Sequence, residues 1–302
     1  MIRRAVDSCL AQTGATFEVL VVDDGSTDGT AEVVEALGDP RVTVLRHPVN
    51  RGVCAARNTA IARARGRWCA LVDSDFELLP GALEGLLEAC SRAPEDVGNV
   101  ASRCVWDNGL ETPRPDPGEE LLLDYPGYLK FVEDLSVSEW FNCMRREVFD
   151  RVRFPETRAY EGGFHLRVAR RFRFLLLQRR SVKIYTDAKN RVTLSAPPQA
   201  ARRMLRDARD SAREAEAVLA EHAEAFRAHA PRLLHHYAEA AFLNHLLAGE
   251  RLEALRWLPE LGPRPGARTL VHASLGLLGP RPLAWAKAHW TWGRHRPRAA
   301  EA

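Results

Sequence analysis

Short apolar runs alternate with amphipathic segments over the first 92 residues, and this alternation constrains the fold more than any other feature. Runs that are short and rich in β-branched residues, as buried strands are, lie at 17–22, 42–45 and 68–72. Segments with helical spacing of apolar residues follow them at 28–37, 53–64 and 80–92. Strands that alternate with helices at this spacing predict βαβ units and a mostly parallel sheet flanked by helices.

The pattern changes twice further along the chain. After residue 93 the sequence predicts a mixed region, with a Pro- and Gly-rich loop at 107–118 and a short helix at 161–171. Short strands are predicted there at 99–106, 138–144, 172–177 and 181–186. Beyond Pro197-Pro198, residues 199–260 are rich in Ala, Leu, Arg and Glu at helical spacing, and further helices are predicted at 267–278 and 281–292.

We therefore expect an α/β domain over residues 1–195 and an all-helical region over 196–302. Within the α/β domain, a first half of about residues 1–95 carries the alternating pattern. The second half, about 96–195, is mixed. Open α/β sheets bind ligands beyond the carboxyl ends of their strands. Because the alternating strands lie in the first half, we expect a ligand to bind there.

Charge and cysteine content exclude several classes of protein. Lys and Arg total 43 against 40 Asp and Glu, a formal charge of +3, and no segment concentrates the basic residues as nucleic-acid binding requires. The six cysteines form no CxxC pair, which argues against a structural zinc site. Several lie within apolar runs, where reduced thiols and a cytoplasmic location are the simplest expectation. No apolar run reaches the length of about 18 residues that spans a bilayer.

The C-terminal segment combines aromatic and basic side chains. Trp285, Trp290 and Trp292 stand among Lys287 and Arg294. Such a segment can rest on an anionic membrane surface. A packed helix followed by a solvated basic tail explains the same pattern, so peripheral contact with the inner face of a membrane stays open beside a purely cytoplasmic location.

The first group of residues suited to chemistry is Asp23-Asp24-Gly25-Ser26, directly after the strand at 17–22. A carboxylate at a strand end can accept hydrogen bonds from a nucleotide base or a ribose. Gly25 allows the sharp turn. An ordinary strand–turn–helix junction, with an aspartate as the helix cap, would use the same residues.

The second group is Asp73-Ser74-Asp75, after the strand at 68–72. Carboxylate oxygens are hard ligands that suit Mg²⁺ or Mn²⁺. Such ions keep several waters and bind diphosphate oxygens, so two protein carboxylates are enough. A helix cap with a solvated turn is the alternative interpretation.

The third group lies between the two acidic turns and comprises Asn50-Arg51-Gly52 and Ala56-Arg57-Asn58. A guanidinium at Arg51 or Arg57 can hold a diphosphate or order the carboxylates of the turns. Arginine on the solvated face of an amphipathic helix is the alternative.

Taken together and in this order, the motifs resemble glycosyltransferase family 2. The resemblance rests on Gln12-Thr13, Val21 to Asp28, Asn50-x-Gly52, Ala56-Arg57-Asn58 and Leu71 to Asp75. It covers about residues 5–90 strongly and 138–195 moderately. It implies a GT-A fold with an all-helical C-terminal extension, a nucleoside-diphosphate sugar as donor, a divalent metal (Mn²⁺ or Mg²⁺) and transfer with inversion. The acceptor would be a glycan or a lipid-linked glycan.

The resemblance also implies residue roles. Asp24, with Asp23, would contact the nucleotide base, and Asp73 would lie near the ribose and phosphates. Asp75 would be the main metal ligand, assisted by Asp73. Asn50 and Arg57 would belong to the nucleotide site. On the acceptor side, Trp140 could stack on a sugar or belong to the core.

The general base is less clear from the resemblance. The family places a Glu-Asp pair before a helix that carries an arginine, and here the run is Tyr160-Glu161-Gly162-Gly163-Phe164-His165-Leu166-Arg167. Counting back from Arg167 puts Glu161 at the position of the base. Counting from the acid puts Gly162 there. The first register aligns the helix, so Glu161 is the predicted base, with Glu156 as a weaker alternative. His165 is expected to be a packed or surface residue.

One departure from the family concerns the start of the chain. Family members begin with an apolar strand before the helix that ends in Gln-Thr, whereas this sequence begins within that helix. A start further upstream is one explanation, and a truncated, inactive copy is the other. The second keeps a non-catalytic sugar-nucleotide-binding or scaffold protein as an alternative function. A nucleotidyltransferase is disfavoured because no Gly-rich basic loop occurs near the N-terminus.

Overall fold

The structure, a computed structural model, describes residues 1–135, 139–156, 161–185, 197–261 and 267–294. Contacts between residues divide the chain into two compact units. The first contains Met1–Thr157 and Phe164–Thr186, and the second contains Arg158–Gly163 and Asp187–Ala302. The short segment 158–163 thus groups with the C-terminal region.

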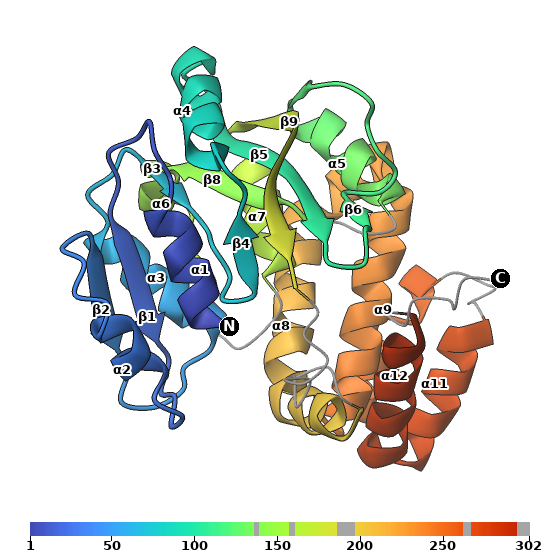
Figure 1. Cartoon of the computed structure of the whole chain (residues 1–302). Helices are drawn as coiled ribbons and strands as arrows, with labels where there is room; N and C mark the ends of the chain where they lie inside the picture. Colours follow the sequence, from blue (N-terminus) through green and yellow to red (C-terminus); the bar gives the residue numbers. More distant parts are fainter. Residues whose placement is uncertain (136–138, 157–160, 186–196, 262–266, 295–302) are drawn as a thin grey trace, which may run out of the picture. The chain divides into compact units, whose positions relative to one another are not determined.

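The first unit begins as the sequence predicts. Strands β1 (Val19–Asp23) and β2 (Val42–Arg46) pair in parallel, with Val19 opposite Val42, and helix α2 (Thr30–Glu35) connects them. Helix α3 (Val53–Arg63) follows β2. These elements form the βαβ unit expected from the alternating pattern, and Figure 1 shows them together at the left of the view.

A seven-stranded sheet forms the rest of the first unit. Its main order is β3-β8-β5-β9-β4, with β6 paired to β5 and β7 paired to β9. The strands are β3 (Trp68–Ala70), β4 (Phe76–Leu78), β5 (Val97–Trp106), β6 (Glu111–Thr112), β7 (Leu121–Leu123), β8 (Phe141–Arg145) and β9 (Arg173–Ile184). The segments 172–177 and 181–186, predicted as two strands, belong to the single strand β9.

Pairing direction in this sheet differs from the expectation. Only β5 and β9 are parallel, and the other pairs, including β3 with β8, are antiparallel. The α/β class is confirmed, and the parallel arrangement holds for β1–β2 and β5–β9. An apolar run shows that a strand is buried, but it carries no information on the direction of a partner that comes much later in the chain.

Helices cover the sheet and fix the acidic turns. The helices of the first unit are α1 (Ile2–Leu10), α4 (Ala82–Arg92), α5 (Tyr125–Asp134), α6 (Val148–Arg151) and α7 (Gly162–Ala169), besides α2 and α3. The side chains of α4 pack on the sheet, where Leu86 joins Val97, Phe141 and Leu175 in one buried cluster. Helix α1 is pinned to β4, because the Ser8 hydroxyl accepts a hydrogen bond from the Leu78 N–H at 3.0 Å.

The described part of the second unit consists of helices joined by short turns. Its long helices are α8 (Pro197–His229) and α9 (Pro231–Leu247), followed by α10 (Arg251–Leu255), the 3₁₀ turn η1 (Pro259–Leu261), α11 (Ala267–Leu278) and α12 (Pro280–Arg294). Small buried residues such as Ala212 on α8 and Ala241 on α9 allow close packing, and His245 bridges Glu216 and Glu250 at 2.9 Å each. None of the described helices is long and apolar enough to cross a membrane.

Candidate active site

Two acidic turns lie at strand ends in the first unit. The first follows β1, where Asp23 is the last strand residue and Asp24 comes next. The second, Asp73-Ser74-Asp75, separates β3 from β4. The contacts of the two turns differ, and so does what each turn can do.

The carboxylate of Asp24 is fully engaged by neighbouring groups. Its Oδ1 accepts from the Arg51 N–H at 2.9 Å and lies 2.7 Å from His47 Nδ1, and its Oδ2 accepts from the Gly52 N–H at 2.7 Å. Burial raises the pKa of Asp24, but the two backbone hydrogen bonds and the histidine outweigh it and hold the pKa below its usual range. Asp24 therefore holds the turn that leads into α3.

The backbone around Gly25 explains why glycine stands there. Gly25 has φ +74°, and a Cβ at this position would lie 2.7 Å from the Asn50 nitrogen. The Asn50 side chain donates to the Asp24 carbonyl at 3.1 Å, and Asp23 Oδ1 accepts from the Ser26 N–H at 3.1 Å. Asp23, Asp24 and Asn50 are thus brought together, as the sequence predicts.

Helix α3 connects the two acidic turns. Arg57 on this helix donates to Asp73 Oδ1 at 2.8 Å and lies 5.4 Å from the centre of the Phe154 ring. The next residue, Asn58, exchanges two hydrogen bonds with the Phe154 backbone, at 3.0 and 3.3 Å. Arg57 is largely buried, whereas the Asp73 side chain is 41 % exposed, so Asp73 is held by an arginine yet open to a ligand.

Asp75 lacks comparable compensation. Burial, and after it the charge of Asp73, raises its pKa, while Arg4 opposes the shift more weakly. A divalent cation would relieve this repulsion, and two carboxylates suit Mg²⁺ or Mn²⁺. Among the described residues no group of three or more His, Cys, Asp or Glu is placed to hold a metal.

Glu139 is a member of this acidic site that the sequence analysis missed. It lies two residues before β8, the antiparallel partner of β3. Burial, followed by the charges of Asp73 and Asp75, raises the pKa of Glu139 to about 7. The only signal that could have found it is the β3–β8 pairing, which brings it beside the second acidic turn.

The side chains of Trp140 and His165 are packed within the protein. Trp140 is buried and stacks on Phe131 with ring centres 5.6 Å apart, which favours the core interpretation. Burial and the nearby Arg57 lower the pKa of His165 to about 3, so its imidazole is neutral. Within the described part of the chain, His165 Nδ1 is buried and has no hydrogen-bond partner.

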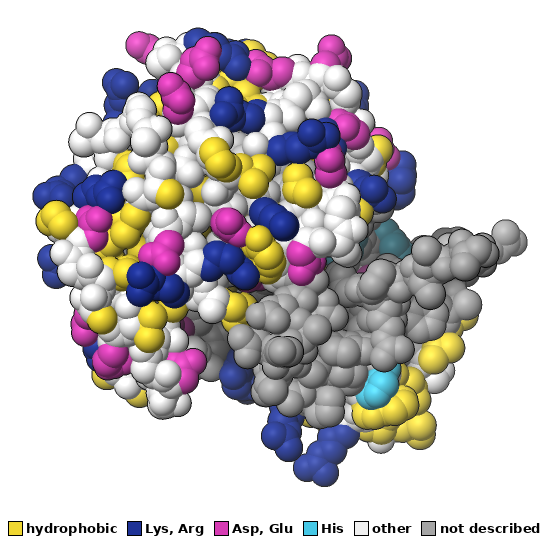
Figure 2. Space-filling model, in the orientation of Figure 1, with side chains coloured by type: hydrophobic (Ala, Val, Ile, Leu, Met, Phe, Trp, Pro, Cys, Tyr) yellow, Lys and Arg dark blue, Asp and Glu magenta, His cyan; other side chains and the backbone are white. Residues whose placement is uncertain are grey.

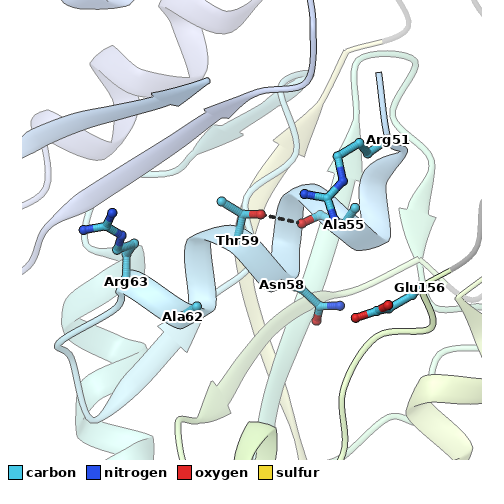
Figure 3. Close-up of a pocket in the computed structure, with 7 residues that line it drawn as sticks. All are labelled: Arg51, Ala55, Asn58, Thr59, Ala62, Arg63 and Glu156. Carbon is cyan, nitrogen blue, oxygen red and sulfur yellow. Dashed lines mark hydrogen bonds between the residues drawn. The ribbon is translucent and has the colours of Figure 1, made fainter. Parts of the chain in front are cut away.

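A pocket of about 330 Å³ lies along another face of α3 (Figure 3). Arg51, Ala55, Asn58, Thr59, Ala62, Arg63 and Glu156 line it. Helical spacing turns Ala55, Thr59 and Ala62 roughly opposite to Arg57. Glu156 lines this pocket beside Asn58, and its role as the alternative general base stays a prediction.

Glu161 occupies the turn directly before α7. Its neighbour Tyr160, which takes the place of the family's glutamate, lies outside the described residues. The segment 158–163 belongs to the second unit, whereas Asp73 and Asp75 belong to the first. The role of Glu161 as the base therefore stays a prediction.

The architecture, a mixed α/β sheet flanked by helices with carboxylates at strand ends, is that of the GT-A glycosyltransferases. The sequence profile described as Glycosyl transferase family 2 matches residues 1–153, about half of the chain. The chain belongs to glycosyltransferase family 2.

Individual proteins agree with this assignment. The succinoglycan biosynthesis protein ExoO of Rhizobium meliloti is 48 % identical over 94 residues, which are 31 % of this chain and 27 % of ExoO. The match thus spans about a quarter of that relative's length. The fold is similar to S. aureus TarS 1–349 in complex with UDP-GlcNAc, with a TM-score of 0.54, 19 % identity and 85 % of each chain covered. It is also similar to the mannosyltransferase PcManGT from Pyrobaculum calidifontis in complex with GDP-Man and Mn²⁺, with a TM-score of 0.50, 19 % identity, and 98 % of this chain and 84 % of that chain covered.

Proposed function

We propose that this chain transfers a sugar from a nucleoside-diphosphate sugar to a glycan acceptor, with inversion and with the help of a divalent cation. The observation that carries the proposal is the second acidic turn, where Asp73 contacts Arg57 at 2.8 Å and Asp75 is half-buried with a raised pKa. Carboxylates that repel each other in a protein of this family suit a metal and a diphosphate. Bound there, Mn²⁺ or Mg²⁺ would neutralise the charge that develops on the departing nucleoside diphosphate.

Asp75 is the proposed main ligand of the cation, with Asp73 beside it. Arg57 holds Asp73 in place and, being a planar cation, can also donate to a phosphate. Asp23, Asp24 and Asn50 form the proposed base and ribose side of the donor site. Because the carboxylate of Asp24 is already occupied by His47 and two backbone N–H groups, we infer that it acts there mainly by holding the shape of the turn.

The acceptor hydroxyl needs a base that removes its proton as the new bond forms. Glu161 is the proposed base. Glu139 is a second candidate, because it lies in the same unit as Asp73 and Asp75 and the charges of both act on it. Its pKa of about 7 is suited to accepting a proton near neutral pH.

A polysaccharide or lipid-linked glycan is the proposed acceptor class, since ExoO is named for succinoglycan biosynthesis. Contact with a membrane would suit such an acceptor. Residues 267–294 contain no Asp or Glu, yet Leu277, Leu278 and Trp285 are 60, 78 and 62 % exposed. Figure 2 shows apolar side chains gathered at the lower right, in the area of α11 and α12.

Vesicle sedimentation tests the membrane contact. We expect the full chain to bind vesicles that contain phosphatidylglycerol more strongly than vesicles of phosphatidylcholine alone, and binding to weaken with salt. A double variant, Leu277→Ser with Leu278→Ser, should lose most of the binding. The control Leu122→Ser changes a leucine of the first unit that is 44 % exposed and should bind as wild type. Equal sedimentation of all three proteins would contradict the contact.

Release of nucleoside diphosphate tests the main proposal. A panel of UDP- and GDP-sugars is incubated with the protein, with and without Mn²⁺ or Mg²⁺, and with short glycans as acceptors. Release that needs metal and is lost in Glu161→Gln but retained in Glu139→Gln supports the transferase with Glu161 as base. The opposite pattern assigns the base to Glu139. Donor binding without release under every condition favours the alternative, a non-catalytic sugar-nucleotide-binding protein.

A further inference from the structure

Arg4 occupies a position next to the second acidic turn that neither the motifs nor the family resemblance assigns. It lies in the first turn of α1, and its guanidinium carbon is 3.5 Å from the centre of the Tyr185 ring. The Tyr185 N–H in turn donates to the Asp75 carbonyl at 3.2 Å. Tyr185 therefore links Arg4 to Asp75, the proposed metal ligand. The charge of Arg4 opposes the rise in the pKa of Asp75 that burial and the charge of Asp73 cause.

The position of Arg4 is fixed by the helix that carries it. Ser8 accepts from the Leu78 N–H at 3.0 Å, and Gln12 donates to the Leu79 carbonyl at 3.1 Å and accepts from the Leu83 N–H at 3.1 Å. These contacts attach α1 to β4, the strand that begins immediately after Asp75. The guanidinium is thus held at the acidic turn by the scaffold and does not depend on a mobile loop.

Two nitrogens of the Arg4 guanidinium lack hydrogen-bond partners. The residue is half-buried, and its Nε and Nη2 atoms are buried with no hydrogen-bond partner within the described ranges of the chain. A buried donor that makes no hydrogen bond costs free energy, and stacking on a tyrosine compensates only part of that cost. By contrast, the preceding residue Arg3 is exposed and pairs with Asp7 at 2.8 Å.

A second cation strengthens the positive field at this point. The ammonium of Lys183 on β9 lies 4.8 Å from the centre of the same Tyr185 ring. Two cations that flank one aromatic ring, beside a carboxylate suited to a divalent metal, form a site for a multiply charged anion. Arginine is well suited to phosphate oxygens, because its planar fork can donate two parallel hydrogen bonds.

We propose that Arg4, stacked on Tyr185 beside Asp75, binds the diphosphate of the donor nucleotide. This inference rests on the proposed function, since it places the diphosphate at the second acidic turn. It adds a binding residue from α1 to a site otherwise built from α3 and the segment between β3 and β4. It also gives α1 a role beyond covering the sheet.

The test is calorimetric titration of the full chain with UDP and GDP in the presence of Mn²⁺, and with uridine and guanosine as ligands without phosphate. For whichever diphosphate the wild type binds, Arg4→Met should weaken binding about tenfold or more, which is the effect of one lost charge-assisted contact. Binding of the matching nucleoside should not change. Arg4→Lys keeps the positive charge but lacks the planar guanidinium. Its affinity for the diphosphate should lie between those of wild type and Arg4→Met. The matched control Arg3→Met should bind like wild type.

Thermal unfolding without ligand separates a binding role from a structural one. Because two guanidinium nitrogens of Arg4 are buried without hydrogen bonds and its effect on Asp75 is weak, Arg4→Met should unfold at about the same temperature as wild type. Tyr185→Phe, which keeps the ring, should retain the affinity for the diphosphate, whereas Tyr185→Leu should lower it.

Two results overturn the inference. One is Arg4→Met binding the nucleoside diphosphate as tightly as wild type while Asp75→Asn does not. The other is an equal loss for the diphosphate and the nucleoside together with a lower unfolding temperature, which would mark Arg4 as a packing residue. If the wild type binds neither UDP nor GDP with Mn²⁺, the proposed function fails and this inference fails with it.

Discussion

The two acidic turns of the first unit look alike in the sequence and differ in the structure. Each follows a short apolar strand and contains two aspartates. In the first, Asp24 receives two backbone hydrogen bonds and a contact from His47, and its pKa is lowered. In the second, Asp75 is half-buried near Asp73, and its pKa is raised. The carboxylate of Asp24 is occupied by contacts within the protein, whereas Asp75 is the proposed ligand of a cation.

This difference shows how support of the fold and a candidate site can be separated between two turns of one unit. A carboxylate that the protein itself satisfies contributes to stability and has little left to offer a substrate. A carboxylate that repels its neighbours lowers stability and gains by binding a cation. Substitutions in the two turns should therefore have opposite consequences for stability and function.

The largest effect is expected at the second turn. Asp75→Asn removes a charge from the proposed metal site, so metal-dependent release of nucleoside diphosphate should fall by about a thousandfold. The free energy of unfolding should stay the same or rise, because the repulsion between Asp75 and Asp73 is relieved. Donor turnover and urea unfolding measure the two quantities. A clear loss of stability in this variant would erase the contrast between the turns.

The second prediction concerns Asp24 and has the opposite sign for stability. Asp24→Asn replaces a largely buried carboxylate by an amide and so weakens its contacts with two backbone N–H groups and His47. The substitution should lower the free energy of unfolding by about 2–3 kcal/mol. Because the pKa of Asp24 is lower in the folded protein, its stabilising effect is present above the unfolded pKa and is lost as the pH falls through the folded pKa. Urea unfolding at pH 7 and at acidic pH measures this.

A control for that substitution lies four residues away. Asp28→Asn changes a fully exposed aspartate whose carboxylate contacts only Thr30 nearby. It should cost much less stability than Asp24→Asn. Similar losses in the two variants would mean that the contacts of Asp24 contribute little.

The third prediction uses the pH dependence of Glu139. Its pKa is about 7 in the folded protein, above that of an unfolded glutamate, so its neutral form favours folding. The stabilisation is complete below the unfolded pKa of about 4.5 and is lost as the pH rises through about 7. Wild type without metal should lose about 5 °C more in unfolding temperature than Glu139→Gln between pH 5 and pH 8. Parallel curves for the two proteins would contradict this.

Part of the fold could be predicted from the sequence. The alternating strands and helices, the α/β class and the positions of both turns follow from apolar periodicity and from Gly25. The helical region beyond residue 197 follows from composition, and helix 267–278 was predicted with the bounds that the structure gives. Local patterns are sufficient for these features because each depends on neighbours in the chain.

The missed features depend on contacts between distant segments. Strand β4 has only three residues, Phe76–Leu78, and its partner β9 comes about a hundred residues later. Glu139 became visible only once β8 was paired with β3. The sequence also does not show that the N–H groups of Arg51 and Gly52 donate to the carboxylate of Asp24, whose contact with the nucleotide stays a prediction.

The smallest predicted effect tests whether the first turn extends into α3 as a purely structural network. His47 lies between Asp24, at 2.7 Å from its Nδ1, and the Thr59 hydroxyl, at 2.9 Å from its Nε2. The hydroxyl also donates to the Ala55 carbonyl at 2.9 Å, as drawn in Figure 3. Thr59→Val removes the hydroxyl and leaves the contact between His47 and Asp24.

We expect Thr59→Val to lower the free energy of unfolding by about 1 kcal/mol, which is typical of one lost hydrogen bond. Turnover of the donor should not change, because His47 contacts Asp24 in the first acidic turn and Thr59 on α3. Urea unfolding and initial rates at saturating donor measure the two quantities. A loss of turnover larger than the loss of stability would show that the His47 network reaches the substrate, and the two turns would then share the chemistry.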